Sequence, residues 1–284
     1  MSAKTRPWLL LAPTLAFFFL FVFLPVGVAL YQSFFSWDLL TPPRWVGIRN
    51  YTSLISTGAL LSVLGRTLLF AILVVLGTTA SGLGLALLLN REGRFFAFVR
   101  ASIFSAYVVS WVAVSLLWLW ILDPDRGLVA KLLSLIGITD VRLLSDPKSV
   151  VPTLAVVAVW KITGYAMVIF LAGLQTIPTS VLEAARLDGA NAWSRFVHIL
   201  WPMLKPTTSF VTTTSLILAF QAFDIIRIMT QGGPANASKL FVYAIYEAVF
   251  LNLRVGEASA LTVVFFVVLL VLSLGQFHAW RAKA

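Results

Sequence analysis

The chain of 284 residues contains no cysteine and few charged residues. The absence of cysteine excludes disulfides, thiol catalysis and cysteine-ligated metal sites. Charged residues make up 11% of the chain and hydrophobic residues 60%, whereas a soluble domain carries roughly 25% charged residues. The apolar residues gather in runs long enough to cross a hydrocarbon layer about 30 Å thick. The composition therefore predicts an integral membrane protein.

The formal net charge of +10 raises the question of nucleic-acid binding. No basic run with interleaved aromatic residues accompanies that charge, so we expect no nucleic-acid partner. Lysines and arginines that hold loops at the cytoplasmic face of a membrane explain the excess, because such loops are enriched in both residues.

About six apolar runs are long enough to cross a membrane as α-helices, so we predict an all-α integral membrane protein in contact with lipid. A β-barrel is disfavoured, because barrel strands alternate apolar and polar residues. The first run follows Lys4 and Arg6 and also fits a signal peptide, but its length favours a retained span. The predicted spans are Trp8–Tyr31, Leu61–Leu89, Ala101–Leu122, Val151–Leu174, Thr207–Ile226 and Ala260–Phe277.

Loop charges predict the orientation of these spans. The shortest and most basic loop is NREGRFFAFVR, residues 90–100, and short basic loops stay in the cytoplasm. This places both termini in the cytoplasm of a multi-pass protein in a prokaryotic cell membrane. Residues 1–284 are expected to form one membrane domain, with a polar cytoplasmic segment at 178–206. The outer loop 123–150 is expected to carry a short helix near Leu128–Ile136.

The second predicted span contains a run of small residues, GTTASGLGLALLL, at positions 77–89. Small residues allow two helices to approach closely in a membrane, where packing drives their association. We therefore expect this run to serve ordinary helix packing.

The segment EAARLDGANAWSRFVHILWPMLKP, at 183–206, is charged and helix-forming although it lies between two apolar runs. Thr179 or Ser180 is expected to cap a first helix, which Gly189 ends. Asn191 is expected to cap a second helix, which Pro202 ends. Such a compact helical knob suits docking into a partner's groove. An amphipathic loop at the bilayer interface is the alternative that the residues alone leave open.

This segment resembles the EAA loop of binding-protein-dependent ABC importer permeases. The family pattern is E-A-A, three residues, glycine, nine residues, then I-x-L-P. Here Trp201 replaces the usual leucine before Pro202. In the family this loop docks as a coupling helix into a cleft of a cytoplasmic ATPase. The coupling residues that the resemblance implies are Glu183, Ala184, Ala185, Asp188, Gly189 and Ala190.

Other segments resemble the carbohydrate branch of that family, the branch of the maltose and glycerol phosphate permeases. They are WKITGYAMVIFLAGLQTIP, FDIIRIMTQGGPANASKLFVYAIYEAVF, VGEASALTVVFFVVLL and VGIRNYTSLI. The resemblance covers nearly the whole chain and implies the bundle of a type I importer permease. Departures occur at Arg66, where an Asn-Thr pair is usual, at Ala106 in place of proline, and at Ala130 in place of asparagine.

The resemblance also implies partners: an ABC ATPase dimer, a second homologous permease subunit, and an extracytoplasmic binding protein that delivers a carbohydrate, glycerol phosphate or glycerophosphodiester. The chain contains no G-x-x-x-x-G-K-[ST], so ATP and Mg belong to the partner and no cofactor is expected here. We expect no catalytic residue and no metal site. The alternatives are a homo-oligomeric channel, which needs no ATPase-docking loop, and an intramembrane enzyme. The chain lacks H-E-x-x-H and G-x-S-x-G, which disfavours an enzyme.

Lys161 lies about ten residues into the fourth predicted span, where an ionisable group is costly and normally faces a cavity or a partner. It is expected to donate hydrogen bonds to cargo or to form a structural ion pair, with Asp224 or with the second permease. The family resemblance suggests a structural or gating role for Asp224.

Four further side chains complete the predicted substrate path. Arg66 and Arg227 lie at predicted outer membrane ends, where they attract an anionic cargo or extend toward lipid headgroups. The rings of Trp160 and Tyr165 stack on sugar faces or pack within the bundle. Together with Lys161, the two arginines favour an anionic or zwitterionic cargo.

Overall fold

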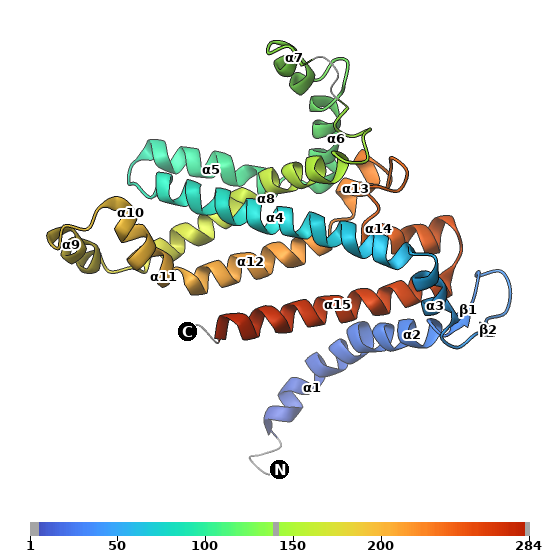
Figure 1. Ribbon diagram of the computed structural model, residues 1–284. Coiled ribbons are helices and arrows are strands. Elements are labelled where there is room, and N and C mark those ends of the chain that lie inside the picture. The colour runs from blue at the N-terminus through green and yellow to red at the C-terminus, as the bar shows by residue number, and fades with distance from the viewer. Residues whose placement is uncertain (1–5, 139–141, 282–284) are drawn as a thin grey trace. The chain divides into compact units, whose positions relative to one another are not determined.

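The computed structural model describes residues 6–138 and 142–281, which are mainly helical (Figure 1). The chain forms two compact units. Unit 1 comprises Met1–Val63 and Tyr243–Gly275, and unit 2 comprises Leu64–Val242 and Gln276–Ala284. The segment 178–206 therefore belongs entirely to unit 2.

Unit 1 holds the first predicted span, which forms one continuous helical stretch with a π-helical turn in its middle. A two-stranded antiparallel hairpin follows, in which Phe35 pairs with Trp45 and Ser36 with Arg44. The elements that begin or lie in this unit are α1 (Arg6–Phe18), η1 (Phe19–Phe23), α2 (Leu24–Gln32), β1 (Phe35–Ser36), β2 (Arg44–Trp45), α3 (Arg49–Ser56), α4 (Ala59–Leu89), η3 (Glu247–Leu251) and α15 (Val255–Arg281).

Polar side chains fasten the hairpin of unit 1. The Asn50 side chain donates to the carbonyls of Ser33 and Phe35, at 2.7 and 2.9 Å. The Tyr51 hydroxyl lies 2.7 Å from the Ser33 hydroxyl. At Gly256, near the start of α15, a Cβ atom would lie 1.8 Å from the Phe35 carbonyl oxygen. The glycine thus allows α15 to begin directly against β1.

Unit 2 contains most of α4, which leads into a bundle of further helices. They are α5 (Arg94–Val108), α6 (Trp111–Ile121), α7 (Leu128–Ser134), α8 (Val150–Gln175), α9 (Thr179–Leu187), α10 (Ala192–Arg195), η2 (Phe196–Leu200), α11 (Trp201–Met203), α12 (Lys205–Phe220), α13 (Asp224–Met229) and the start of α14 (Phe241–Tyr246). The short helix α7 confirms the helix predicted near Leu128–Ile136.

Helix α8 is the centre of unit 2. The small residues of α4 pack against it: a Cβ atom at Gly82 would lie 2.6 Å from the Cβ atom of Ala166. The hydroxyls of Ser81 and Thr163 hydrogen-bond at 2.7 Å across the same contact. These contacts confirm that the small-residue run of the second predicted span serves helix packing.

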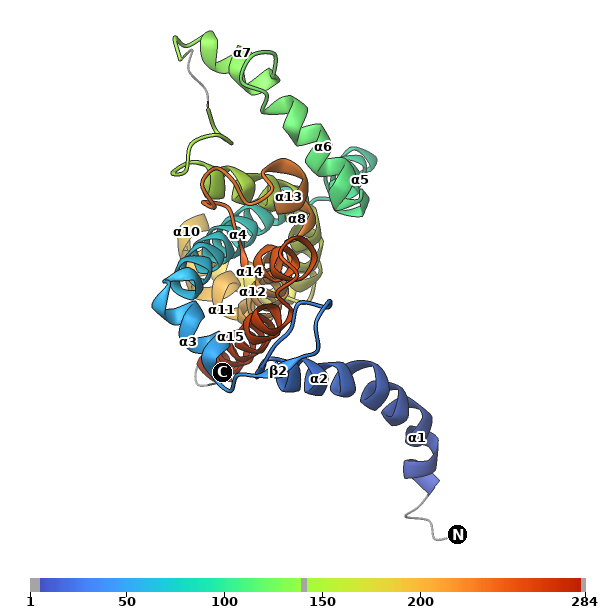
Figure 2. The same ribbon diagram turned by 90° about the vertical axis from the view of Figure 1, so that its right-hand side faces the viewer.

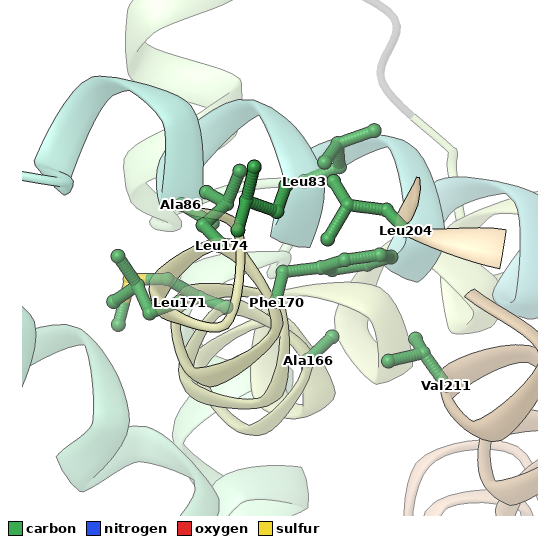
Figure 3. Packing of buried hydrophobic residues seen from close by; sticks show 10 residues of the cluster. Leu83, Ala86, Ala166, Phe170, Leu171, Leu174, Leu204 and Val211 are labelled. Atoms are coloured by element: carbon green, nitrogen blue, oxygen red, sulfur yellow. The ribbon is translucent and has the colours of Figure 1, made fainter. Parts of the chain in front are cut away.

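An apolar cluster joins α4, α8 and α12 (Figure 3). The ring of Phe170 lies among leucines in the close-up, and its side chain is fully buried. The buried members are Leu83, Ala86, Ala166, Met167, Phe170, Leu171, Leu174, Ile177, Leu204 and Val211. Ile177 directly precedes the predicted coupling segment and Leu204 lies near its end, so that segment is tied to the core at both ends.

Each predicted span coincides with helical structure, but two differ from the prediction. Within residues 6–138 and 142–281, four helices are long and apolar enough to cross a membrane, or five when α5 and α6 are counted as one broken span. The third predicted span is bent by 101° between these two helices (Figures 1 and 2). The fifth, predicted at Thr207–Ile226, is interrupted: α12 ends at Phe220 and α13 begins at Asp224.

Candidate functional site

The predicted coupling segment begins with α9. Pro178 occupies the N-cap position, with an extended backbone at ψ 132°, and no side chain in the described chain caps this helix. The expectation that Thr179 or Ser180 caps it is therefore wrong. The fixed φ of Pro178 sets the entry to the helix, and Thr179 is already its first helical residue.

Helix α9 ends in a Schellman turn. Gly189 adopts the left-handed conformation at φ +78°. Its N–H bonds the Arg186 carbonyl at 3.1 Å, and the Ala190 N–H bonds the Ala185 carbonyl at 2.9 Å. These two bonds satisfy carbonyls that a helix end leaves open. The sequence prediction that Gly189 ends this helix is confirmed.

The second helix of the segment begins as predicted but continues further. The Asn191 side-chain oxygen accepts a hydrogen bond from the Ser194 N–H at 2.8 Å, which confirms the predicted cap. Pro202 does not end the helix, because the chain stays helical through η2 and α11 to Met203. Pro202 follows a wider π-helical turn, in which the Trp201 N–H bonds the Phe196 carbonyl, and the helix ends one residue after the proline.

The coupling segment has an inner and an outer face. Leu182, Phe196 and Leu200 pack against the apolar cluster of α4, α8 and α12. Leu187 and Trp193 face outward, with 89% and 72% of their surfaces exposed. Large apolar side chains that are exposed in this way are typical of a surface that binds a partner protein. Of the residues assigned to coupling, Glu183, Ala184, Asp188 and Gly189 are exposed, Ala190 is half-buried and Ala185 is buried.

The segment lies at one end of unit 2. Figure 1 shows α9 and α10 near the turn between α4 and α5, and α13 at the other end of α8. The turn, residues 90–93, belongs to the basic loop 90–100, whose remaining residues form the start of α5. Within it, Nη1 of Arg100 donates to the carbonyls of Leu89 and Arg91, at 2.8 and 2.9 Å, and so closes the end of α4. The basic loop and the coupling segment therefore share one end of the unit.

Lys161 lies on α8 with 3% of its surface exposed. Its ammonium group donates to the backbone carbonyls of Ala106, at 3.2 Å, Tyr107, at 3.0 Å, and Val109. These carbonyls belong to the break between α5 and α6. The ammonium also lies 5.0 Å from the centre of the Trp111 ring. The bonds to carbonyls occupy the three donors that a lysine carries.

The two aromatic residues predicted to line the path also contact the broken span. Trp160 packs edge-to-face on Trp118 of α6, with ring centres 5.6 Å apart. Tyr165 stacks on Tyr107 of α5 at 5.0 Å. The structure thus brings Trp160, Lys161 and Tyr165 together on the side of α8 that faces α5 and α6.

The other predicted path residues lie on α4 and α13. Arg66 is half-buried on α4. Asp224 is in the first turn of α13 and Arg227 in its last turn, and both are half-buried. The hydrogen bonds of Lys161 lead to the α5–α6 break, so the structure groups this lysine with Trp160 and Tyr165. Arg66, Asp224 and Arg227 lie on other helices.

Sequence reasoning missed Ser110 and Gly164. The Ser110 hydroxyl oxygen accepts a hydrogen bond from the Ala113 N–H at 3.2 Å and caps α6. A Cβ atom at Gly164 would lie 2.5 Å from the Ile103 carbonyl oxygen, so α5 crosses α8 at this glycine. A serine is a preferred helix-start residue, but Ser102, Ser105 and Ser115 lie in the same predicted span, so the sequence alone does not single out Ser110.

A cavity of about 400 Å³ lies at the α13 end of unit 2. Leu119 and Leu122 from the end of α6, Asp123 after it, and Met229 and Thr230 at the end of α13 line one part of it. The remainder is lined by Pro124, Gly233, Pro234 and residues 142–145. Gly233 and Pro234, which follow α13, therefore border this cavity. Among the described residues, no group of three histidine or acidic side chains is placed to hold a metal ion.

Comparison with known proteins identifies the family. Residues 79–283 match the family described as "Binding-protein-dependent transport system inner membrane component". The sn-glycerol-3-phosphate transport system permease protein UgpA of Agrobacterium fabrum is 35% identical over 277 residues, covering 97% of this chain and 94% of that protein. The sulfoquinovosyl glycerol transport system permease protein SmoG of the same organism is 32% identical, covering 91% and 84%.

A solved structure agrees with these relatives. A chain of a bacterial ABC transporter involved in the import of the acidic polysaccharide alginate matches with a TM-score of 0.82 and 25% identity, over 98% of this chain and 96% of that chain. A second structure holds that transporter in complex with an alginate-bound periplasmic protein. This chain belongs to the family of binding-protein-dependent transport system inner membrane components, the permease subunits of ABC importers.

Proposed function

We propose that this chain forms half of the membrane path of an importer for an anionic carbohydrate or glycerol phosphate compound. We further propose that residues 178–206 couple it to a separate ATPase. A second permease subunit and an extracytoplasmic binding protein complete the assembly, and both termini lie in the cytoplasm. The observation that carries the coupling role is that the knob formed by α9, α10 and η2 packs one face on the apolar cluster and exposes the other.

The geometry of the knob supports force transmission. Its inner face is fastened to the core through Leu182, Phe196 and Leu200, so a push on the knob reaches α8 and α12. Its outer face exposes Glu183 and Leu187, which suits a groove on a partner protein. The Schellman turn at Gly189 joins the two short helices, and a Cβ atom added at Gly189 would meet no atom within 4 Å.

The charges at the knob's end of unit 2 support the proposed orientation. The basic loop 90–100 lies at the same end as α9 (Figure 1). Short basic loops remain in the cytoplasm, which is also where ATP is available. The cavity lined by Leu122, Asp123 and Thr230 then opens toward the outside, where a binding protein delivers cargo.

The nature of the cargo rests on the relatives and on charge. The named relatives concern sn-glycerol-3-phosphate and sulfoquinovosyl glycerol, and the matching solved structure concerns an acidic polysaccharide. Arg66 and Arg227 are half-buried cations on α4 and α13, and Asp224 lies one turn before Arg227. We propose that the two arginines raise the local concentration of an anionic cargo, and that Asp224 contributes to gating.

The coupling role is tested with Glu183→Ala and a matched control, Glu92→Ala, which removes an exposed acid from the basic loop at the same end. The complete transporter is purified through this chain, and cargo uptake into proteoliposomes is measured with loaded binding protein. We expect Glu183→Ala to lower uptake at least tenfold while the second permease still co-purifies, and Glu92→Ala to leave uptake near the wild-type rate. Full uptake by Glu183→Ala, or failure of an ATPase to co-purify with the wild-type chain, refutes the proposal.

A further inference from the structure

The break between α5 and α6 is an irregular backbone segment within a predicted membrane span. Helix α5 ends at Val108, α6 begins at Trp111, and the two are bent by 101°. A helix end leaves carbonyl groups without intrahelical partners. Such groups need a partner where water is excluded, so a broken helix at membrane depth persists only when the surrounding protein satisfies it.

Lys161 supplies that partner. Its ammonium group bonds the carbonyls of Ala106, Tyr107 and Val109, which end α5 and form the break. The carboxyl end of a helix carries partial negative charge, which favours a cation at this position. The rings of Tyr107 and Trp111, with centres 5.8 and 5.0 Å from the ammonium, add a favourable environment for its charge.

Both arms of the broken span are held by the same face of α8. Trp160 contacts α6 through Trp118, and Tyr165 contacts α5 through Tyr107. Gly164 brings the backbone of α5 against α8. Positions 160, 161, 164 and 165 share one helical face, because residues three and four apart are neighbours on a helix surface. One face of α8 therefore contacts the chain on both sides of the break, through four residues.

Helix α8 connects this clamp to the proposed coupling segment. It is an uninterrupted α-helix to Gln175, and α9 begins at Thr179. The clamp lies roughly 20 Å before the end of α8, given a rise of about 1.5 Å per residue. In the other direction, α6 packs on α13. The end of α6 lines the cavity beside Thr230.

We propose that Lys161 locks the α5–α6 break to α8, so that α8 and α6 move together and carry the motion of the coupling segment to the cavity at the α13 end. This inference rests on the proposed coupling function of residues 178–206. Lys161 is then a positioning residue that acts through the backbone of the break. Its role requires the charge and the hydrogen-bond donors.

The first test substitutes the lysine in the complete transporter. Lys161→Met keeps the length of the side chain without its charge, Lys161→Arg keeps charge and donors, and Lys131→Met, on exposed α7, is the matched control. ATPase activity is measured with and without loaded binding protein. We expect Lys161→Met to lose at least tenfold of the cargo-stimulated activity while basal activity remains, Lys161→Arg to retain more of it, and Lys131→Met to resemble the wild type. The inference is overturned if loaded binding protein stimulates the ATPase activity of the Lys161→Met transporter as strongly as that of the wild type.

A second test does not depend on the folding of the Lys161 variants. The chain has no cysteine, so Trp118→Cys and Trp160→Cys can be joined by a short reducible cross-linker that ties α6 to α8. If the two helices move as one body, the cross-linked transporter keeps at least half of the uptake rate of the unlinked double variant. Uptake that stops on cross-linking and returns on reduction shows that the helices slide past each other and overturns the inference.

The two tests separate this inference from the proposed function. If Glu183→Ala blocks uptake but Lys161→Met is stimulated normally, the coupling segment stands and the Lys161 lock is rejected. If Glu183→Ala transports normally, the coupling function itself fails. In that case the cross-linking result still reports whether α6 and α8 move together.

Discussion

At the scale of single residues, Gly164 sets the distance between α5 and α8. A Cβ atom there would lie 2.5 Å from the Ile103 carbonyl oxygen and 2.8 Å from the Cα atom of Phe104. Both atoms belong to backbone, which cannot rotate away. We expect Gly164→Ala to force the helices apart and to destabilise the permease by about 1–3 kcal/mol. Thermal unfolding of the purified transporter should show a lowered midpoint.

The matched control for that substitution is Gly84→Ala on α4. No atom lies within 4 Å of the added Cβ position at Gly84, and alanine is favoured over glycine in a helix by about 0.5–1 kcal/mol. The midpoint should therefore stay constant or rise slightly. Equal midpoints for Gly164→Ala and the wild type would mean that α5 does not cross α8 at this glycine.

The sequence predicts that Lys161 needs partners but does not predict which groups they are. Its depth in an apolar run correctly marks it as a group that needs partners. From the sequence, the expected partners of Lys161 are Asp224, the second permease or cargo, because backbone carbonyls in a helix are normally bonded within that helix. The carbonyls become available only because α5 ends at Val108, a break that hydrophobicity alone does not reveal. Ser110 caps α6, but three other serines in the same apolar run look alike in the sequence and cap no helix in the described chain.

At the scale of elements, the turn between α9 and α10 depends on the left-handed backbone of Gly189. The space around a Cβ atom at this position is open, so substitutions there act through backbone conformation. A residue other than glycine loses about 1–2 kcal/mol in that conformation, whereas asparagine tolerates it better. We expect Gly189→Val to lower cargo uptake several-fold and Gly189→Asn to remain near the wild-type rate. Uptake assays with equal amounts of reconstituted transporter measure both.

This pair of substitutions separates backbone conformation from side-chain size. If both variants transport equally poorly, a partner must approach Gly189 too closely for any side chain. If both transport normally, the angle between α9 and α10 has no part in coupling, and our reading of the turn is wrong.

The elements that local signals define were predicted well. The caps at Gly189 and Asn191 and the helix α7 follow from residue types at fixed positions. Two predictions differ from the structure. The helix at Pro202 continues one residue further, to Met203. The third span is broken, and tertiary packing stabilises the break because Lys161 of α8 bonds its freed carbonyls. A sequence pattern does not record that partner.

At the scale of the whole molecule, the distribution of charge and the direction of the helices together predict the membrane topology. The basic loop 90–100 and the coupling segment share one end of unit 2. The loop that contains α7 extends from the end of α6, after the break. If α4 and α8 cross the membrane, the loop that contains α7 lies on the opposite side from the basic loop and the coupling segment. The family membership places the protein in an inner membrane but does not give the direction.

The absence of cysteine makes this topology directly measurable. Glu92→Cys is exposed in the basic loop, and Leu135→Cys, with 81% of the native side chain exposed, lies directly after α7. A membrane-impermeant maleimide added to spheroplasts should label Leu135→Cys at once and Glu92→Cys only after the membrane is permeabilised. Leu187→Cys should behave like Glu92→Cys, and a co-expressed ATPase should slow its labelling, because docking would cover this exposed position of α9. Labelling of Leu187→Cys in sealed spheroplasts would place the coupling segment outside, where no ATPase could reach it.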